Sequence, residues 1–247
     1  MENFNSAIAT LDSLAKIYEI FVPSLNKKVK FKGLTTKQQK DAVKCALDKN
    51  VAGVVFSNLV NSIITENSLE KNSYLLSDRN YIIACLRVLS LSKTFQTEEG
   101  EKDLSFITSF STPVPEILKS REIVEDDITL KLSIPTLEKD TFVNSETRKK
   151  LAPLPDDDNF AKESIGEVFV NELIKYIDVF SVKSPAVTIN FNDLTFQQKV
   201  QLVEKLPLNL NTKLVDYINE TKAFEKKYFV LNDKELDISI DPTLFTV

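Results

Sequence analysis

The stretch Tyr18–Lys32, YEIFVPSLNKKVKFK, decides how the first part of this chain folds. A run of strand-forming residues, Tyr18–Val22, leads into the turn-forming run Pro23–Asn26, after which lysines alternate with Val29 and Phe31. Residues two apart lie on one face of a strand, and the turn lets the second strand fold back on the first. The stretch therefore predicts a β-hairpin with Val29 and Phe31 facing inward.

A capped helix is expected directly after the hairpin. Thr35 can accept a hydrogen bond from the backbone amide three residues on, and Gln38 can reach back to the Thr35 amide, which is the capping-box pattern. We expect the helix to run to about Asp48.

Three more helices are predicted around this unit from the spacing of apolar residues. An amphipathic helix from Phe4 to about Lys16 opens the chain. The segment Val51–Thr65 carries a wide apolar stripe, which is typical of a helix at the centre of a core. The segment Tyr81–Leu91 is apolar nearly throughout, so it is either buried in the core or an interface helix, and burial is the commoner outcome.

The middle of the chain is expected to be a connector. The stretch from Thr97 to about Glu125 is polar and acidic and then carries Pro113 and Pro115, which favours little regular structure. Apolar and polar residues alternate over Ile128–Ile134, which predicts one half-buried strand whose partner is not obvious. A second proline-bearing junction follows at 149–155.

The last third is expected to be mainly helical. A strand is predicted at Val187–Phe191, a helix capped by Asn211 runs to about Lys226, and Tyr228–Ile240 is a closing hairpin. Before them lies a long amphipathic helix from about Phe160 to Phe180, whose apolar face is formed by Ile165, Phe169, Leu173, Ile177 and Phe180.

One short pattern occurs twice. Leu194–Gln198 repeats the capping signature of Leu34–Gln38, and the helix after it ends near Pro207. The matching residues are 160 positions apart: Phe31, Leu34, Thr35 and Gln38 match Phe191, Leu194, Thr195 and Gln198. Strand, turn and capped helix therefore occur in both halves, although two uses of a good cap could converge on the same residues.

These patterns together predict an α+β fold, predominantly helical with short β-hairpins, in two lobes that each hold a strand, a turn and a capped helix. We expect an N-terminal hairpin-plus-helices domain at 1–110, a connector with one strand at 111–155 and a C-terminal helical domain with a closing hairpin at 156–247.

Composition narrows the class of protein. With 247 residues, 43% hydrophobic and 27% charged, the chain can bury one large core or two small ones. The net charge of −5 argues against a dedicated nucleic-acid binder. No apolar run is long enough to cross a bilayer and no secretory signal opens the chain, so we expect a cytoplasmic protein. Cys45 and Cys85 belong to no paired motif and are expected to be buried, reduced thiols.

The chain has no histidine, which bears on catalysis. This excludes serine triads, Cys–His dyads and zinc sites of the HExxH type, and leaves paired carboxylates, lysine chemistry or a magnesium site for an enzyme. Asp156, Asp157 and Asp158 are the best magnesium candidate, because hard cations take carboxylate oxygens. Acidic residues just before a helix also cap its amides, and that simpler interpretation is favoured. We therefore assign no catalytic, cofactor-binding or metal-binding residue.

Two clusters of like charge also need an interpretation. Lys28, Lys30 and Lys32 share one face of the predicted strand, so with Lys27, Lys37 and Lys40 they could present a basic patch to an acidic partner. Alternation in a half-buried hairpin requires one polar face in any case. Glu98, Glu99, Glu101 and Asp103 surround Gly100 without the ligand order of an EF-hand, which indicates an exposed acidic loop.

The hairpin also carries a family resemblance. Phe21–Ser24, then Lys27–Phe31, then a short turn into a lysine-rich helix resemble the baseplate hub proteins and hub assembly proteins of T-even-like myophages. The resemblance extends over the predicted helices to about Phe95. Gln38 and Gln39 stand where that family is expected to have an acidic pair, and the chain after about residue 110 shows no clear relative.

The resemblance implies a non-enzymatic structural or assembly protein of a contractile phage tail, without cofactors. Its partners would be hub or wedge proteins of the baseplate, in a multi-copy hetero-oligomeric assembly. The assembly would be built in the host cytoplasm, and the baseplate of the virion tail is the second expected location. Two alternatives stay open from the residues alone: a small carboxylate and magnesium enzyme at Asp156–Asp158, and an adaptor for an acidic partner at Lys27–Lys40.

Overall fold

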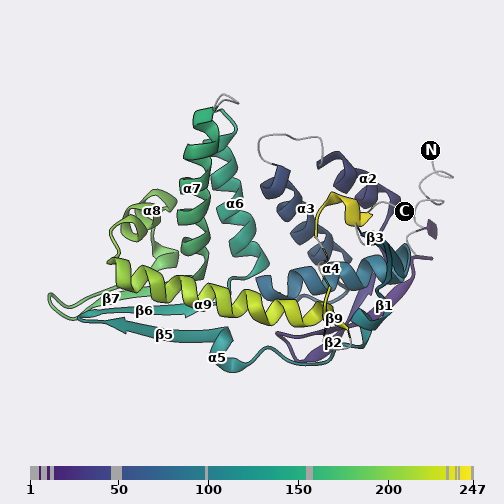
Figure 1. Ribbon diagram of the computed structural model, residues 1–247, viewed down its shortest axis with the longest axis horizontal. Coiled ribbons are helices and arrows are strands. Elements are labelled where there is room, and N and C mark those ends of the chain that lie inside the picture. Colours follow the sequence, from purple (N-terminus) through teal and green to yellow (C-terminus); the bar gives the residue numbers. More distant parts are fainter. Residues whose placement is uncertain are drawn as a thin grey trace.

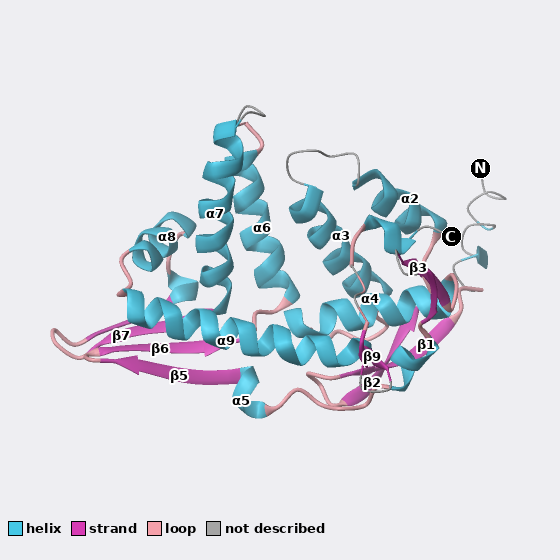
Figure 2. Cartoon of the chain, viewed as in Figure 1, coloured by secondary structure: helices cyan, strands magenta, loops and turns pink. Residues whose placement is uncertain are grey.

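The computed structural model describes residues 14–45, 52–97, 100–153, 158–231, 234–236 and 240–245, together with residues 6, 10, 11 and 238. Figure 1 labels the elements along the chain, and Figure 2 shows that helices make up most of it. The helices are α2 Thr36–Cys45, α3 Ala52–Asn67, α4 Leu76–Ser90, α5 Glu116–Lys119, α6 Leu137–Leu151, α7 Asp158–Tyr176, α8 Phe196–Glu204 and α9 Leu208–Lys226. The strands are β1 Ile17–Val22, β2 Lys27–Lys32, β3 Thr94–Thr97, β4 Gly100–Asp103, β5 Ser120–Glu125, β6 Ile128–Ser133, β7 Ile177–Val182, β8 Val187–Asn190, β9 Val230–Leu231 and β10 Lys234–Glu235. Short 3₁₀ turns are η1 Ser105–Ser109, η2 Phe191–Asp193, η3 Lys227–Phe229 and η4 Pro242–Phe245.

The first hairpin forms as expected. β1 and β2 pair antiparallel, and Asn26 takes the positive φ of 50° that the turn needs. Val29 and Phe31 are fully buried, and the Phe31 ring packs against Tyr74 at 5.8 Å between centroids. The inward face predicted from the alternation is confirmed.

The helices after this hairpin are confirmed too. The Gln38 amide donates to Thr35 Oγ1 over 3.2 Å, and the Thr35 amide donates to Gln38 Oε1 over 3.0 Å, so both bonds of the capping box exist. Helix α4 is buried along almost its whole length, so of the two alternatives it is a core helix and not an interface helix. The expected end of α2 near Asp48 and most of the expected opening helix from Phe4 to Lys16 lie outside the described residues.

The prediction of a connector with a single strand is wrong in its secondary structure. β3 and β4 form a hairpin in which Gly100 adopts a φ of 110°, and the 111–155 segment contains β5, β6, α5 and the full helix α6. Helix α6 was not predicted because its buried face is partly polar: Asp140, Asn144 and Thr147 point inward alongside Val143. Its pattern therefore lacks an apolar stripe. The division of the chain into three domains stays a prediction.

A four-stranded antiparallel sheet, in the order β5-β6-β7-β8, organises the second half. Strand β6 matches the prediction, and β5 and β7 are the partners that the sequence did not reveal. The helix expected to reach Phe180 ends at Tyr176, because Ile177–Val182 pairs with β6 as strand β7. Helices α6, α7 and α8 stand over this sheet, and α9 runs along it (Figure 1).

The short repeat extends well beyond the four matching residues. β1 and β7 begin at residues 17 and 177 and end at 22 and 182, so both boundaries differ by 160. The hairpin register differs by the same 160, since Ile20 pairs with Val29 and Phe180 with Ile189. α2 and α8 begin at 36 and 196, and the second capping box is complete at 2.9 and 3.3 Å. We name this hairpin plus capped helix the repeated unit.

Helix α9 and the chain end tie the two halves together. α9 packs against α4 at one end and against β5 at the other, and Figure 1 shows it spanning the long axis. It begins at Leu208 after Pro207, so Asn211 lies inside its first turns and is not the cap. Further on, β9 and β10 form the closing hairpin, and Gln39 donates to the Phe245 carbonyl of η4 over 2.8 Å. The α+β, mainly helical class is confirmed.

Candidate functional site

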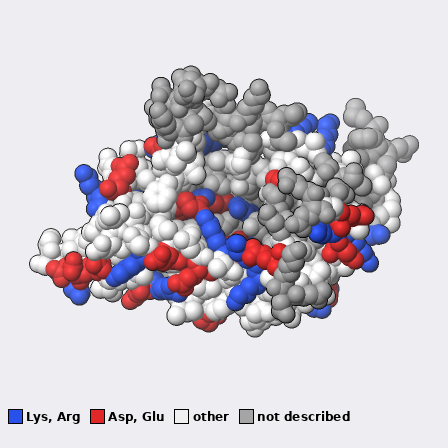
Figure 3. Space-filling model, viewed as in Figure 1, with Lys and Arg blue, Asp and Glu red and all other residues white. Residues whose placement is uncertain are grey.

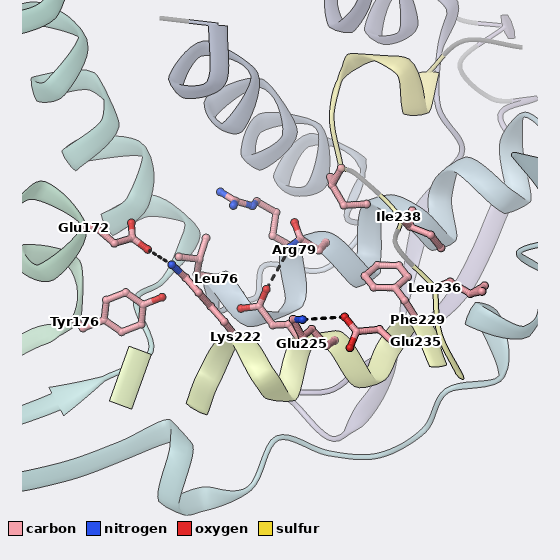
Figure 4. A pocket seen from close by; sticks show the side chains of 13 residues that line it. Leu76, Arg79, Glu172, Tyr176, Lys222, Glu225, Phe229, Glu235, Leu236 and Ile238 are labelled. Atoms are coloured by element: carbon pink, nitrogen blue, oxygen red, sulfur yellow. Dashed lines mark hydrogen bonds and ion pairs between the residues drawn. The ribbon is translucent and has the colours of Figure 1, made fainter. Parts of the chain in front are cut away.

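A pocket of about 450 Å³ lies where α4, α7 and α9 meet the closing hairpin. Figure 4 shows charged side chains from three helices on its walls: Arg79 from α4, Glu172 from α7, and Lys222 and Glu225 from α9. Leu236, Ile238 and Phe229 close its other side. The pocket therefore combines a polar wall with an apolar one.

Most charged groups of the pocket are paired with each other. Lys222 lies 3.5 Å from Glu172, and Lys226 lies 2.9 Å from Glu235. Arg79 reaches behind the wall to Asp140, 3.1 Å away. These pairs leave little fixed charge to attract an ion or a charged substrate.

Asp140 is the centre of a buried network behind the pocket. Its carboxylate accepts from Asn61 at 2.8 Å and lies 2.7 Å from the Lys175 ammonium, whose side chain is only 10% exposed. Burial raises the pKa of Asp140, but Lys175 and Arg79 outweigh it and hold that pKa below its usual range. The network connects helices α3, α4, α6 and α7, so its role is structural.

Glu225 is the exception in the pocket wall. Burial raises the pKa of this carboxyl to about 7, and the nearby cations Arg79 and Lys222 only partly oppose it. Asn80 donates to Glu225 Oε2 over 3.2 Å. No cation of the described residues forms a direct ion pair with Glu225, so it exchanges a proton near neutral pH.

The pocket offers no complete catalytic set among the residues that the structure describes. Burial raises the pKa of Tyr176 well above its ordinary value, so its phenol stays protonated and cannot act as a base. Within the described ranges no group of three acidic or cysteine side chains could hold a metal ion. The arrangement links α4, α7 and α9.

The candidates from sequence do not converge on the pocket. Asp156 and Asp157 lie outside the described residues, and Asp158 is the first residue of α7. Glu98 and Glu99 also lie outside them, while Glu101 is on β4. Asp103, also on β4, accepts from the Ser105 amide over 2.8 Å and so stabilises a turn. Cys45 and Cys85 are both buried thiols.

The lysines of the first hairpin share a face, as expected. Lys28 and Lys30 are exposed and Lys32 is half-buried on the side of β2 opposite Val29. Lys27 pairs with Glu70 at 2.9 Å, where both side chains are about half exposed. A basic surface is therefore present on this hairpin.

An exposed apolar surface on α7 is the feature that the sequence misassigned. Ile165 is 71% exposed and Phe169 47% exposed, although both were expected to pack inward with Leu173. Val168 is also exposed, and we call Ile165, Val168 and Phe169, which share one face of the helix, the α7 patch. In Figure 3 the charged side chains gather in a band over α9, and the surface over α7 carries few of them. The helical spacing in the sequence showed that this face of α7 is apolar. It did not show that Ile165 and Phe169 stay largely exposed.

Within the described residues, no helix combines the length and hydrophobicity that spanning a membrane requires. No curated protein and no solved structure matches the chain. A family model described as T4 bacteriophage base plate protein matches residues 15–234, which is most of the chain and far more than the stretch that carries the resemblance. The chain therefore belongs to the T4 bacteriophage base plate protein family.

Proposed function

We propose that this chain is a non-enzymatic structural or assembly protein of the baseplate hub of a contractile phage tail. It works by contacts with other hub or wedge proteins, and it is present in several copies within a hetero-oligomeric assembly. Assembly takes place in the host cytoplasm. Membership of a baseplate family supports a role in the phage tail, and the surface of the chain supports protein contacts as the means.

The α7 patch is the observation that carries this proposal. Its three residues are Ile165, Val168 and the aromatic Phe169, which are 71%, 46% and 47% exposed. Large apolar side chains that gather on a surface mark sites of protein contact more often than scattered ones do. The upper ends of α6 and α7 project beyond α3 and α8 in Figure 1.

An enzyme is the weaker alternative. The pocket holds one carboxyl that exchanges a proton near neutral pH, Glu225, but its other cations and carboxylates are mostly paired, and the described residues include no group of three side chains that could hold a metal ion. The adaptor alternative is compatible with the proposal, because a basic hairpin face can be one of several contact surfaces.

The test is affinity capture with each baseplate protein of the same phage, produced one at a time together with the tagged chain. Capture of a hub protein is expected, and capture of a wedge protein alone would move the chain out of the hub. Purified tails analysed in parallel show whether the chain stays in the particle as a subunit or leaves as an assembly factor. Failure to capture any baseplate protein would contradict the proposal.

A matched pair of variants tests the α7 patch. Ile165→Glu puts a charge where the side chain is 71% exposed, so the fold should be unaffected and capture should fall at least tenfold. Asn219→Glu adds the same charge at an exposed position of α9 and should leave capture unchanged. Equal capture by both variants would show that the α7 patch is not a contact site.

A further inference from the structure

The outer edge of β1, the side that faces away from β2, is a second surface with a specific geometry. Among the described residues β1 pairs only with β2. An unpaired strand edge presents a row of backbone donors and acceptors and readily accepts another strand. Whether the edge of β1 can do so depends on which of its backbone N–H and C=O groups point outward and on what covers them.

The direction of the backbone groups follows from two hydrogen bonds. The Gly33 amide donates to the Lys16 carbonyl across the hairpin over 2.9 Å, and the Lys30 carbonyl accepts from Leu69 on the far side of β2 over 2.9 Å. In an antiparallel pair, residues alternate between pointing both groups at the partner and pointing both away. The backbone groups of Ile17, Glu19 and Phe21 therefore point to the outer edge, where none has a hydrogen-bond partner among the described residues.

The repeated unit shows what such an edge accepts in this chain. β7 is the counterpart of β1, and its odd-numbered residues also point away from the hairpin partner, because the Lys183 amide donates to the Asp127 carbonyl over 2.9 Å. There the edge is filled by β6, which pairs antiparallel with β7. Strand β6 buries the apolar residues Leu130 and Leu132 on its inner face and exposes Lys131 on its outer face. The same edge is thus filled within the chain in one copy of the unit and unpaired among the described residues in the other.

A second copy of this chain fits the edge poorly. Two β1 strands paired around a two-fold axis with matching faces, in the register that covers the whole of Ile17–Phe21, place Glu19 opposite Glu19. Like charges then lie directly opposite each other. The register shifted toward the turn, with Ile20 opposite Ile20, extends the pairing to Pro23, whose carbonyl already accepts from the Val114 amide over 3.0 Å. A short strand from a different protein, paired with Ile17–Phe21 alone, avoids both conflicts.

The faces of the hairpin set the chemistry of that strand. On the inner face Ile20 is 3% exposed, so the neighbouring position of an added strand should be apolar. On the outer face an added strand lies directly beside Ile17, Glu19 and Phe21, with Lys28 and Lys30 one strand farther away, so it should be basic opposite Glu19.

We propose that the outer edge of β1 pairs with an extended strand of another baseplate protein, apolar at alternate positions and basic where it lies opposite Glu19. This inference rests on the proposed function, since it names the second contact through which the chain joins the baseplate. It is independent of the α7 patch, which lies on other elements.

Amide hydrogen exchange tests the edge itself. In the uncombined protein the amides of Ile17, Glu19 and Phe21 should exchange quickly, while those of Tyr18 and Ile20 should be protected by β2. In the complex with a captured baseplate protein all five should be protected. Protection of the three outward amides before any partner is added would overturn the inference, because the chain would then cover its own edge. Their continued fast exchange in the complex would overturn it as well.

A proline variant tests the requirement for pairing. Glu19→Pro removes an amide that points away from β2, so the hairpin keeps its own hydrogen bonds while the edge loses a donor. Capture by the partner should fall at least tenfold, whereas Glu19→Thr, which keeps the amide and loses only the charge, should capture clearly better than the proline variant. Charge reversal by Glu19→Lys should weaken capture of a strand that is basic opposite this position, and stronger capture would refute the stated chemistry.

The outcomes separate this inference from the proposed function. If wild-type protein captures a baseplate protein and Ile165→Glu abolishes capture while Glu19→Pro does not, the function stands and the strand pairing is wrong. If wild-type protein captures no baseplate protein, both are wrong. Unfolding midpoints of all variants show whether the proline has damaged the hairpin, and the exchange pattern of the wild-type protein decides the matter in that case.

Discussion

The hydroxyl of Ser24 donates a hydrogen bond of 2.5 Å to Oδ2 of Asp78, and the Ser24 amide donates to Oδ1 of the same carboxylate over 2.9 Å. Ser24 lies in the turn of the first hairpin, and Asp78 lies in the first turn of α4. The Leu75 amide also donates to Asp78, over 3.0 Å. One buried carboxylate therefore fixes the hairpin turn against the start of the central helix.

Replacement of Asp78 by asparagine should lower the free energy of unfolding by about 2–3 kcal/mol, because an amide nitrogen would face donors and a charge-assisted acceptor would be lost. Ser24→Ala removes only the hydroxyl and should cost about 1 kcal/mol. Urea unfolding of both variants measures the difference. Equal losses would show that the hydroxyl bond accounts for the whole effect of the carboxylate.

The Asp140 network makes a larger prediction. Asp140→Ala leaves the buried Lys175 ammonium with Glu172 alone and should lower the unfolding free energy by about 3–5 kcal/mol. The exposed pair Glu146–Lys149 is the control, and Glu146→Gln should cost less than about 1 kcal/mol. Denaturant midpoints that shift equally in the two variants would contradict the central place of Asp140.

Glu225 predicts how stability depends on pH. Its folded pKa of about 7 lies above the unfolded value of 4.5, so between these values the unfolded chain has released a proton that the folded chain still holds. The stability that this group contributes is therefore complete below pH 4.5, is lost as pH rises to about 7, and changes no further above that. Asp78, with a pKa raised by burial to about 6, adds a loss in the same direction at lower pH.

The variant Glu225→Gln should abolish the part of this dependence that lies between pH 6 and 7 and should be more stable than wild type at pH 8, because glutamine resembles the protonated acid. Unfolding midpoints measured from pH 5 to 8 test this. An unchanged slope in the variant would mean that another group causes the dependence.

The two capping boxes allow a matched comparison. Thr35→Ala and Thr195→Ala each remove the acceptor for an amide in the first turn of a helix and should each cost about 1 kcal/mol, while Asn at either position should preserve most of the stability. Thermal unfolding of the four variants measures these costs. A clear loss at one site only would show that the two copies of the repeated unit are not equivalent in energy.

Several features followed from the sequence because they depend on residues close together in the chain. The turn Pro23–Asn26, the alternation of β2 and the pairing of Thr35 with Gln38 each involve neighbours, and each formed as predicted. The same holds for the repeat at Leu194–Gln198. The full length of the repeated unit could not be recognised in the sequence. The hairpins of β1 and β7 pair in the same register, but their residues differ.

Features that depend on residues far apart in the chain could not be predicted from the sequence. Helix α6 turns Asp140 inward because Lys175 and Arg79 from other helices neutralise it, and no local pattern contains that information. Ile177–Phe180 left the predicted helix because β6 offered a pairing edge.

The sequence by itself determined the local units of this protein and its family, since both rest on residues that are adjacent or on a recognisable motif. Only the tertiary structure decided which surfaces stay unpaired. Ile165 and Phe169 have the same helical spacing as the buried Leu173, and β1 has the same hairpin register as β7. Whether such a face or edge is covered depends on the position of a second element, and the free energy of burial is gained only where that element is present.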